Sequence, residues 1–371
     1  MRIGYDAKRA FWNNTGLGNY SRSVISGMAN FHPEHQLTLF SPGINYDSEL
    51  KSLLPKYSIN LFDLGKGLIG QAKRVVGFDN GSLDIYHGLS NELPIFNHNS
   101  KTKLVVSIHD LLFLRYPEFY PFIDRQIYKL KTLKACKKAH LIIAISEQTK
   151  QDLIEFLNIP EYKIKVHYQS CHSQFRVKHI EQDILKVKAK YGISKPYILQ
   201  VGTLEERKNA LLTLKAYGDS KSKDSFNLVL IGTRTSYCNQ LEKFVADNML
   251  KEKVTFIYKS TFIDFPLLYQ GASLCLYPSL FEGFGIPILE AMTSGTPVIT
   301  SQGGCFQEVG GDAVLYINPL IAKDLKNKID LVLGNDALSN ELIEKGKNRV
   351  LNFEPENLMS ELDKIYKQLF L

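Results

Sequence analysis

Short apolar runs alternate along the chain with longer segments in which apolar residues recur at helical spacing. The runs are too short for helices and have almost no polar interruption, which is typical of strands buried on both faces of a parallel sheet. They lie at residues 104–108, 141–145, 197–201, 226–231, 254–257 and 272–277. Because strand and helix patterns alternate, the sequence predicts an α/β protein made of doubly wound parallel sheets.

This pattern falls into two halves. A charged helical segment and turn-forming residues at 192–196 separate them, after which a new strand pattern starts. A chain of 371 residues is also too long for one ordinary core. Residues 43–80 have no regular pattern, and we expect loops and a helix there. We expect three parts: an N-terminal domain over 1–185, a C-terminal domain over 186–352, and an amphipathic helix over 353–371 that returns toward the first domain.

The stretch at 275–300 carries the strongest chemical signal. An apolar strand is followed by a loop with two glycines at 282–285, and Pro287 stands where the first turn of a helix would begin. Such a loop leaves backbone N–H groups uncovered at the positive end of a helix dipole, which suits an anion or a row of hydroxyls. Glu282 and Glu290 bracket the loop and can accept hydrogen bonds from hydroxyls. An ordinary turn with surface glutamates is the alternative.

Polar groups follow two other strands. Arg207 and Lys208 come after the strand that starts the second half, where a forked guanidinium and an ammonium group would clamp a diphosphate. His109 and Asp110 follow a central apolar strand of the first half, at the end where open α/β sheets bind ligands. Adjacent surface cations, and a packed histidine beside a helix cap, are simpler alternatives that the residues leave open.

A glycine-containing loop, TGLGNY, precedes the first helix pattern and includes Gly16 and Gly18. It does not match a dinucleotide-binding fingerprint, because it follows the first strand at a distance, has Ser21 in place of the third glycine, and lacks an acidic residue after the second strand. A loop that opens over a ligand and a plain loop with a helix N-cap both remain open.

Composition narrows the class of protein. No apolar run approaches the roughly 20 residues that span a bilayer, and no secretory signal is visible. The five dispersed cysteines predict neither disulfides nor a zinc site. A net charge of +7 favours an anionic partner, and without a nucleic-acid-reading motif this means nucleotide phosphates or an anionic membrane. The densest basic run is a helix at 124–138 beside aromatic residues, which is either a solvated face or a membrane-binding surface.

Together these motifs resemble those of the retaining family 4 glycosyltransferases, the mannosyltransferase-like group 1 enzymes. The segment EGFGIPILE is similar to the family's E-x7-E element, and GTLEERKN is similar to its Arg-Lys phosphate motif. TGLGNY and SIHDLLFLRYP resemble its glycine-rich acceptor-side loop and the segment with its cleft histidine. The likeness is close over 197–317 and looser over 1–150. It implies the GT-B fold, in which two Rossmann-like doubly wound parallel-sheet domains face each other across a cleft.

The resemblance also implies roles for single residues. Arg207 and Lys208 would hold the diphosphate of a nucleotide-sugar, Glu290 would bind its ribose, Glu282 would bind the donor sugar, and His109 would lie near the reacting sugar. The catalytic residues so implied are Glu282, His109, Arg207 and Lys208. The implied donor-binding residues are Gly16, Gly18, Gly202, Arg207, Lys208, Tyr258, Glu282, Gly283, Phe284, Gly285, Ile286 and Glu290.

We expect no metal at the donor phosphates and no cofactor other than the donor substrate. No Asp-x-Asp occurs in the sequence, and Arg207, Lys208 and helix N-termini would stabilise the departing nucleoside diphosphate instead. Front-face attack with retention would need no protein base. The family often has Asn-Gly and an Asp around 169–172, where this chain has Gln-Ser-Cys-His, so no role is carried over to that loop.

The expected function is transfer of a hexose to a glycan or lipid-linked acceptor in cell-surface polysaccharide synthesis, such as that of O-antigen. GDP-mannose is the first expectation for the donor. A UDP-hexose donor and a non-catalytic sugar-nucleotide-binding scaffold remain open. We expect a cytoplasmic protein with no nucleic-acid partner, and peripheral contact with the inner, anionic face of the membrane is left open.

Overall fold

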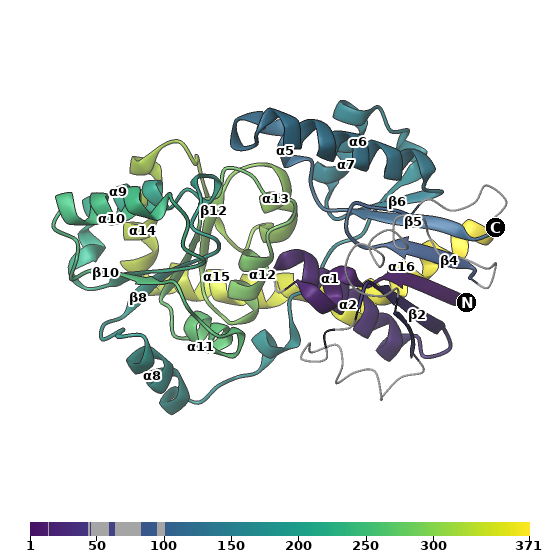
Figure 1. Ribbon diagram of the computed structural model, residues 1–371. Helices are drawn as coiled ribbons and strands as arrows, with labels where there is room; N and C mark the ends of the chain where they lie inside the picture. Colours follow the sequence, from purple (N-terminus) through teal and green to yellow (C-terminus); the bar gives the residue numbers. More distant parts are fainter. Residues whose placement is uncertain (14, 44, 46–58, 64–82, 95–100) are drawn as a thin grey trace. The chain divides into compact units, whose positions relative to one another are not determined.

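The computed structural model describes the chain except for residues 14, 44, 46–58, 64–82 and 95–100 (Figure 1). The chain forms two compact units. The first comprises Met1–Ser170 together with Glu354–Leu371, and the second comprises Cys171–Phe353. Each unit is built around one parallel β-sheet.

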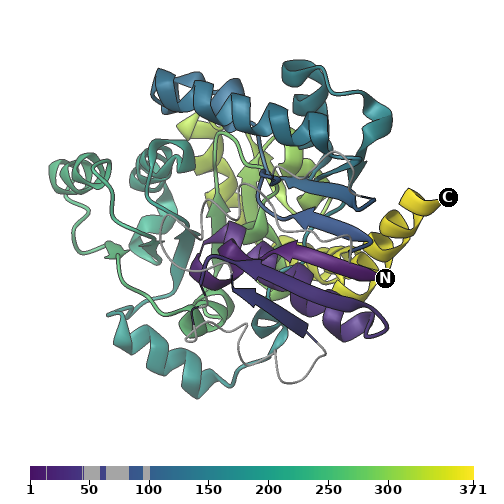
Figure 2. The same cartoon turned by 45° about the vertical axis from the view of Figure 1, so that its right-hand side comes forward.

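Over its described residues, the first unit has a seven-stranded parallel sheet in the order β3-β2-β1-β4-β5-β6-β7 (Figures 1 and 2). The chain builds outward from β1 to one edge and then crosses to build the other, as in a Rossmann-like sheet. The strands are β1 (Arg2–Asp6), β2 (Gln36–Ser41), β3 (Ile59–Asp63), β4 (Ile85–Gly88), β5 (Lys103–Ile108), β6 (Leu141–Ala144) and β7 (Ile164–Val166). The helices include α1 (Lys8–Trp12), α2 (Gly16–Phe31), α5 (Leu112–Arg115), α6 (Phe122–Lys138), α7 (Glu147–Leu157) and α16 (Pro355–Lys367).

The second unit, described throughout, has a six-stranded parallel sheet in the order β10-β9-β8-β11-β12-β13. Its strands are β8 (Tyr197–Val201), β9 (Asn227–Ile231), β10 (Val254–Ile257), β11 (Leu274–Tyr277), β12 (Val298–Ser301) and β13 (Leu315–Ile317). Its helices include α8 (Glu181–Lys190), α9 (Ala210–Asp219), α10 (Cys238–Asp247), α11 (Phe265–Gln270), α12 (Ile286–Thr293), α13 (Gly304–Gly310), α14 (Ala322–Leu333) and α15 (Asp336–Arg349).

The apolar runs of the sequence form β5, β6, β8, β9, β10 and β11, and burial on both faces explains the composition of those that lie inside the sheets. Every residue of β6, β9 and β11 is buried, and every strand pair in the two sheets is parallel. The expected strand at 254–257 coincides with β10, and the expected one at 197–201 coincides with β8. The prediction of doubly wound parallel sheets is therefore confirmed.

The two units divide at Ser170, earlier than the expected boundary at 185, which falls inside α8. The reason is local packing, because α8 packs on α11 of the second unit. The Gln270 side chain also binds the chain before α8: its amide donates to the Val177 carbonyl at 2.7 Å and accepts from the His179 N–H at 3.0 Å. Residues 171–185 thus belong to the second unit.

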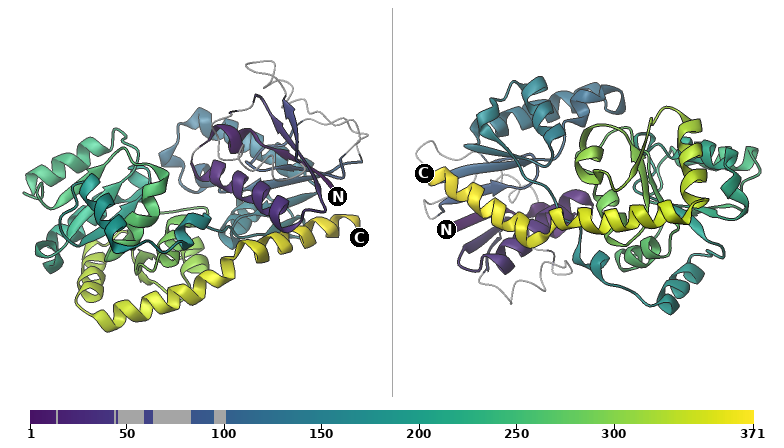
Figure 3. Two further views of the ribbon diagram at one scale, coloured as in Figure 1. Left: turned by 90° about the horizontal axis from the view of Figure 1, so that it is seen from below. Right: turned by 180° about the vertical axis from the view of Figure 1, so that it is seen from behind.

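The last helix, α16, is part of the first unit and lies along α2 (Figure 3). The two helices approach closely at Gly27, where a Cβ atom would lie 2.7 Å from Cγ of Met359. A ring nitrogen of His167 donates to the Leu358 carbonyl at 2.8 Å, which fixes the start of the helix as well. These contacts hold the C-terminal segment against the N-terminal sheet.

Three local features differ from the sequence expectations. A short helix, α1, lies between β1 and TGLGNY, and α2 begins at Gly16, so most of the glycine-containing segment expected to be a loop is helical. The strand β3 lies within 43–80, where loops and a helix were expected, and most of that range lies outside the described residues. All five cysteines are buried, and none of them forms a disulfide. None of the described helices is both long and apolar enough to cross a bilayer.

Candidate active site

Two glycine turns at the carboxyl ends of β8 and β9 form one side of the candidate site. The N–H of Gly202 donates to the Ile231 carbonyl at 2.9 Å. A Cβ atom on Gly232 would lie 1.8 Å from the Gly202 carbonyl oxygen, so only glycine permits this approach of the two turns. Gly202 lies against the alkyl chain of Lys208, since its own Cβ position is 3.5 Å from Cε of that lysine. Gly202 therefore lies beside Lys208, and its contact with the donor stays a prediction, whereas Gly232 was missed.

The expected cation pair lies in a short 3-10 turn, Glu206–Lys208, between β8 and α9. Asn209 ends this turn in the left-handed conformation, and its side-chain amide donates to the carbonyls of Pro278, at 3.1 Å, and Pro319, at 2.7 Å. The Leu280 N–H donates to the Arg207 carbonyl at 2.9 Å. These bonds connect the cation turn to the loop that follows β11. Asn209 is the last residue of GTLEERKN, and the sequence did not indicate its two carbonyl partners.

Glu282 lies between the two cations. Its Oε1 is 2.5 Å from Nζ of Lys208, and its Oε2 is 2.7 Å from a terminal nitrogen of Arg207. The other terminal nitrogen of Arg207 is 2.6 Å from a carboxylate oxygen of Glu205, and Lys208 also donates to the Tyr277 hydroxyl at 3.0 Å. The structure thus brings together three of the four residues expected to be catalytic, as a largely buried charge cluster.

The electrostatics of this cluster follow from burial opposed by ion pairing. Burial alone would raise the pKa of Glu282, but Lys208 and Arg207 outweigh it and lower the value to about 2. Burial lowers the pKa of Lys208, and Glu282 opposes that shift. Burial also disfavours the charge of Arg207, but Glu282 and Glu205 more than compensate and raise its pKa. In the free protein Arg207 and Lys208 are both paired with Glu282. An anionic ligand must therefore compete with this carboxylate to bind them.

The loop after Glu282 leads into α12 as the sequence predicted. Gly285 is the N-cap, Ile286 begins the helix, and Pro287 lies in its first turn. The backbone carbonyl of Glu282 accepts a hydrogen bond from the thiol of Cys305, on α13, at 3.1 Å. The N-terminus of α12 therefore begins a few residues after the charge cluster, which places a helix dipole beside the expected donor-binding loop of Gly283, Phe284 and Gly285.

Glu290 lies farther along α12 and is paired differently from Glu282. It is half-buried, and it accepts a hydrogen bond from the hydroxyl of the buried Tyr269 at 3.0 Å. Burial raises the pKa of Glu290 to about 7, and the Tyr269 hydrogen bond opposes the shift. This carboxyl group therefore changes its charge near neutral pH, which the sequence did not indicate.

Tyr258 lies just after β10 in a different group of side chains. Its hydroxyl donates to Oε1 of Glu242 at 2.5 Å, and the guanidinium of Arg234 lies over its ring. Its ring is also stacked on that of Phe256. The hydroxyl is thus engaged with a neighbouring carboxylate, and a contact of Tyr258 with the donor stays a prediction.

His109, from the first unit, follows β5 as expected. Its Nε2–H donates to the Leu89 carbonyl at 2.8 Å, and its ring meets the ring of Tyr20 edge-on at 4.6 Å. Burial lowers the pKa of His109 to about 4, although the Leu89 hydrogen bond opposes this. The imidazole is therefore neutral at physiological pH. With Nε2 protonated, Nδ1 carries the lone pair and can accept a hydrogen bond.

A buried polar network lies behind His109 and was missed by sequence reasoning. The Tyr20 hydroxyl is 2.7 Å from Oγ of Ser107, which is 2.8 Å from Nε2 of His87. Nδ1 of His87 is 2.6 Å from the hydroxyl of Tyr366, on α16. These partners satisfy polar groups that would otherwise be costly to bury. The network fixes the ring of Tyr20, and so supports the orientation of His109.

The two glycines of the first half differ in what surrounds them. A Cβ atom on Gly18 would lie 1.7 Å from the Asn13 carbonyl oxygen, and the Gly18 N–H donates to the Asn13 side chain at 3.1 Å. Gly18 is thus required by the close approach of the segment between α1 and α2. A Cβ atom on Gly16 would meet open space. The role of both glycines in ligand binding stays a prediction.

Two family models match the chain, one over each part of the fold. The model for glycosyltransferase family 4 matches residues 15–170, and the model for glycosyl transferases group 1 matches residues 183–349. The first range contains Gly16, Gly18 and His109. The second contains the whole cluster of Arg207, Lys208 and Glu282, and also Glu290.

Two curated relatives are mannosyltransferases, which agrees with the family models. The chain is 33% identical to the O-antigen chain mannosyltransferase RfbU of Salmonella typhimurium over 214 residues, which cover 58% of this chain and 56% of the relative. It is 27% identical to O-antigen chain mannosyltransferase B of Escherichia coli over 388 aligned positions, which cover all of both chains. The alignment therefore spans about half the length of one relative and the whole of the other.

Among solved structures, the Anabaena protein HepE, crystallised with UDP and glucose, is similar with a TM-score of 0.77. The match covers 99% of this chain and 100% of that one at 18% identity, which establishes likeness of fold. The two sheets, the matched family models and the site residues in their expected order lead to one conclusion. The chain is an enzyme of the group 1, family 4 glycosyltransferases, with the GT-B fold and mannosyltransferase-like relatives.

Proposed function

We propose that this enzyme transfers mannose from GDP-mannose to a glycan or lipid-linked acceptor in cell-surface polysaccharide synthesis, with retention of configuration and without a metal ion on the donor phosphates. The observation that carries the proposal is the cluster of Arg207, Lys208 and Glu282. Two largely buried cations share one carboxylate there, at the strand ends where α/β sheets bind ligands.

An incoming diphosphate would take over the ion pairs that Glu282 makes in the free protein. Arg207 can bind two phosphate oxygens with its forked nitrogens, and Lys208 adds a compact charge. Once released, Glu282 can accept hydrogen bonds from donor sugar hydroxyls, which is the role implied by the family resemblance. The exchange replaces one carboxylate with a more highly charged anion, so both cations stay paired, and hydrogen bonds from the sugar hydroxyls compensate the released Glu282 carboxylate.

The reaction then needs no protein base. The bond between the anomeric carbon and the phosphate oxygen breaks, and a new bond forms between that carbon and the acceptor oxygen on the same face. The departing phosphate oxygen takes the acceptor proton. Arg207, Lys208 and the N-terminal end of α12 stabilise the negative charge on the leaving group. A neutral His109 can accept a hydrogen bond from a sugar hydroxyl through Nδ1 but is a poor proton donor.

The choice of donor rests on the relatives. Two of them are named mannosyltransferases, whereas the UDP-bound neighbour shares only the fold at 18% identity. A silent scaffold is disfavoured because Arg207, Lys208, Glu282 and Glu290 are all present and the first three are assembled. UDP-hexose use is therefore the main competing outcome of the test below.

A panel of nucleotides and sugar nucleotides tests the proposal. GDP and GDP-mannose should raise the melting temperature by several degrees at concentrations well above their dissociation constants, since a ligand of the native state stabilises it. GDP-mannose should also be hydrolysed slowly in EDTA, with release of GDP. A shift produced by UDP and UDP-hexoses alone would overturn the donor assignment. The absence of any shift and any hydrolysis would overturn the enzyme function, and loss of hydrolysis in EDTA would overturn metal independence.

We also propose that α6 binds the anionic membrane face on which a lipid-linked acceptor would lie. Phe122 and Ile123, at its start, are 65% and 70% exposed, and Ile127 and Leu130 continue the exposed apolar surface. The helix also carries Lys129, Lys131, Lys134, Lys137 and Lys138. Exposed apolar side chains beside a row of lysines are typical of helices that lie in the interface of an anionic bilayer.

Flotation with liposomes tests this surface. The protein should float with vesicles that contain anionic lipid at low salt and remain unbound with neutral vesicles. Ile123→Ser should lower the partition constant for anionic vesicles about tenfold, because one large apolar side chain no longer enters the interface. Met249→Ser is the matched control, since Met249 is an exposed apolar residue of the second unit. Equal recovery with both lipid types, or no effect of Ile123→Ser, would refute membrane binding by α6.

A further inference from the structure

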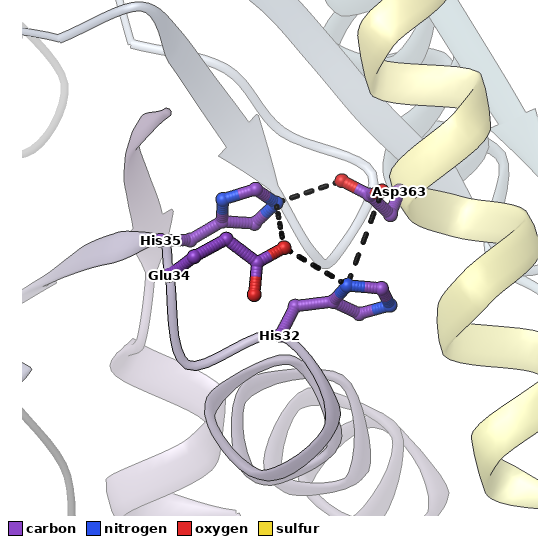
Figure 4. A group of neighbouring side chains, drawn as sticks. All are labelled: His32, Glu34, His35 and Asp363. Atoms are coloured by element: carbon purple, nitrogen blue, oxygen red, sulfur yellow. Dashed lines mark hydrogen bonds and ion pairs between the residues drawn. The ribbon is translucent and has the colours of Figure 1, made fainter.

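Four side chains with metal-binding atoms converge on one place in the first unit (Figure 4). His32 caps the end of α2, Glu34 and His35 follow just before β2, and Asp363 projects from α16. One nitrogen or oxygen from each lies within 4.8 Å of the others. These four residues are separate from the cluster of Arg207, Lys208 and Glu282 and from the side chains described around His109. The function proposed above gives them no role.

The spacing of these atoms fits a four-coordinate ion. Nδ1 of His32 is 3.2 Å from Oε1 of Glu34 and 3.9 Å from Oδ2 of Asp363. Nε2 of His35 is 2.7 Å from Oδ1 of Asp363 and 3.9 Å from Oε1 of Glu34. A zinc ion with ligands at about 2.0–2.1 Å in a tetrahedron requires ligand atoms about 3.3 Å apart. Three of these separations, 3.2, 3.9 and 2.7 Å, link the four ligand atoms when Asp363 binds through Oδ1, and they lie on either side of that value, so small side-chain rotations suffice to bind an ion.

The ligand types indicate which class of ion fits. Two imidazole nitrogens and two carboxylate oxygens suit zinc and its divalent transition-metal neighbours, whereas calcium and magnesium prefer oxygen alone. Two negative charges would balance a divalent cation. The His35 side chain is only 2% exposed, whereas that of Glu34 is 57% exposed. One ligand is therefore held in the interior and another faces solvent, so an ion can enter from the side of Glu34.

Two cationic groups border the cluster and leave its ligand atoms available. Nζ of Lys367 lies 2.6 Å from Oδ2 of Asp363, so Oδ1 of the same carboxylate can bind an ion while Lys367 orients it. The amino group of Met1 is 3.2 Å from Nδ1 of His35. Nδ1 accepts a hydrogen bond from that amino group, so an ion on Nε2, which places the ring proton on Nδ1, requires the Met1 amino group to turn away.

We propose that His32, Glu34, His35 and Asp363 bind one zinc-like divalent cation that clasps α16 to the turn between α2 and β2. His35 and Asp363 are 328 positions apart in the sequence, so the ion would tie the C-terminal helix to the beginning of the chain. Its role is structural, because all four positions are filled by protein ligands and none remains open for a substrate. It stabilises the first unit and leaves the donor site unchanged.

Metal content and thermal stability of the full chain test the clasp. After treatment with EDTA and dialysis, ZnCl2 should load one ion per chain that survives gel filtration and should raise the melting temperature. CoCl2 should give the intense visible absorption of tetrahedral cobalt. Glu34→Gln is the principal variant, because this exposed side chain can be replaced without disturbing the core. It should weaken zinc binding at least about 100-fold, as expected for loss of a direct ligand.

His32→Gln should have the same effect, and His179→Gln is the control, because it removes a histidine of the second unit that lies outside the cluster. Slow donor hydrolysis should be equal in the wild type and Glu34→Gln, which separates the clasp from the donor site. Failure of the wild type to retain zinc would overturn the proposal and leave a hydrogen-bonded cluster. Equal zinc content in the wild type and both cluster variants would also overturn it, because the ion would then be bound elsewhere.

Discussion

Replacing Lys208 with Met should lower kcat for hexose transfer by about 10²–10³-fold, the loss typical when one group that stabilises developing charge is removed. Met preserves the apolar stem that packs against Gly202 but deletes the ammonium group. The departing diphosphate then loses a largely buried cation whose strength comes from exclusion of water. Single-turnover transfer from GDP-mannose, measured at saturating donor, reports the effect on kcat.

The fold should survive this substitution. Glu282 keeps its ion pair with Arg207 at 2.7 Å, so no carboxylate is left without a partner. Lys253→Met is the matched control, because Lys253 is a lysine of the same unit that pairs with Asp224 on the surface. Its kcat should equal that of the wild type. A Lys208→Met enzyme with a normal melting temperature and a kcat within threefold of the wild type would contradict the assigned role.

The parts of the fold that the sequence predicted are those with a strong local signal. Strands buried on both faces are mostly apolar, so their positions could be located from short runs alone, as at β6 and β9. Pro287 marked the start of α12 because its missing N–H suits the first turn. Arg207, Lys208 and Glu282 followed from their positions after predicted strands, since parallel strands bring their carboxyl ends to one edge of the sheet.

The parts that were missed depend on contacts between distant segments. Asn209 matters because its amide reaches the carbonyls of Pro278 and Pro319, and nothing near it in the sequence indicates those partners. Gly232 is explained only by the Gly202 carbonyl that lies against it. Asp363 likewise appears as a surface acid on an amphipathic helix until α16 is placed beside His35. Each requires three-dimensional information that periodicity does not contain.

Charge distribution within the site also required the structure. The sequence suggested that Glu282 and Glu290 act alike, as two hydroxyl acceptors that flank one loop. The structure separates them, because Glu282 is held between two cations and Glu290 has only the neutral Tyr269 hydroxyl. Burial therefore acts against an ion pair at one carboxyl group and almost unopposed at the other, which gives pKa values of about 2 and about 7.

This difference predicts that donor binding tightens as the pH rises through about 7 and that Glu290→Gln abolishes the dependence. A carboxylate can accept hydrogen bonds from both ribose hydroxyls. A protonated carboxyl group carries its own proton on one oxygen, so it has less capacity to accept them. If only the ionised form binds well, the apparent affinity follows the ionised fraction and rises about tenfold from pH 6 to pH 8. GDP-mannose is the suitable ligand, because its diphosphate has no group that titrates in this range.

Calorimetric titration of GDP-mannose between pH 5.5 and pH 8.5 measures the effect. Glu290→Gln should bind about 10²-fold more weakly than the wild type at pH 8, through loss of charge-assisted hydrogen bonds, and should show a flat pH profile. Glu341→Gln is the control, since Glu341 is an exposed acid on α15, and it should reproduce the wild-type profile. Coincident profiles for Glu290→Gln and the wild type would show that this carboxyl group does not bind the ribose.

Stability provides an independent check on the same carboxyl group. A raised pKa in the folded state means that Glu290 contributes stability below about pH 4.5, which is lost as the pH rises through about 7. Glu290→Gln cannot ionise, so at pH 8 it should be more stable than the wild type by on the order of 2 kcal/mol, and at pH 4.5 the two should be equal. Urea denaturation at both pH values measures the difference. If the gain at pH 8 appears without any change in donor affinity, Glu290 is an acid with a raised pKa that the donor does not contact.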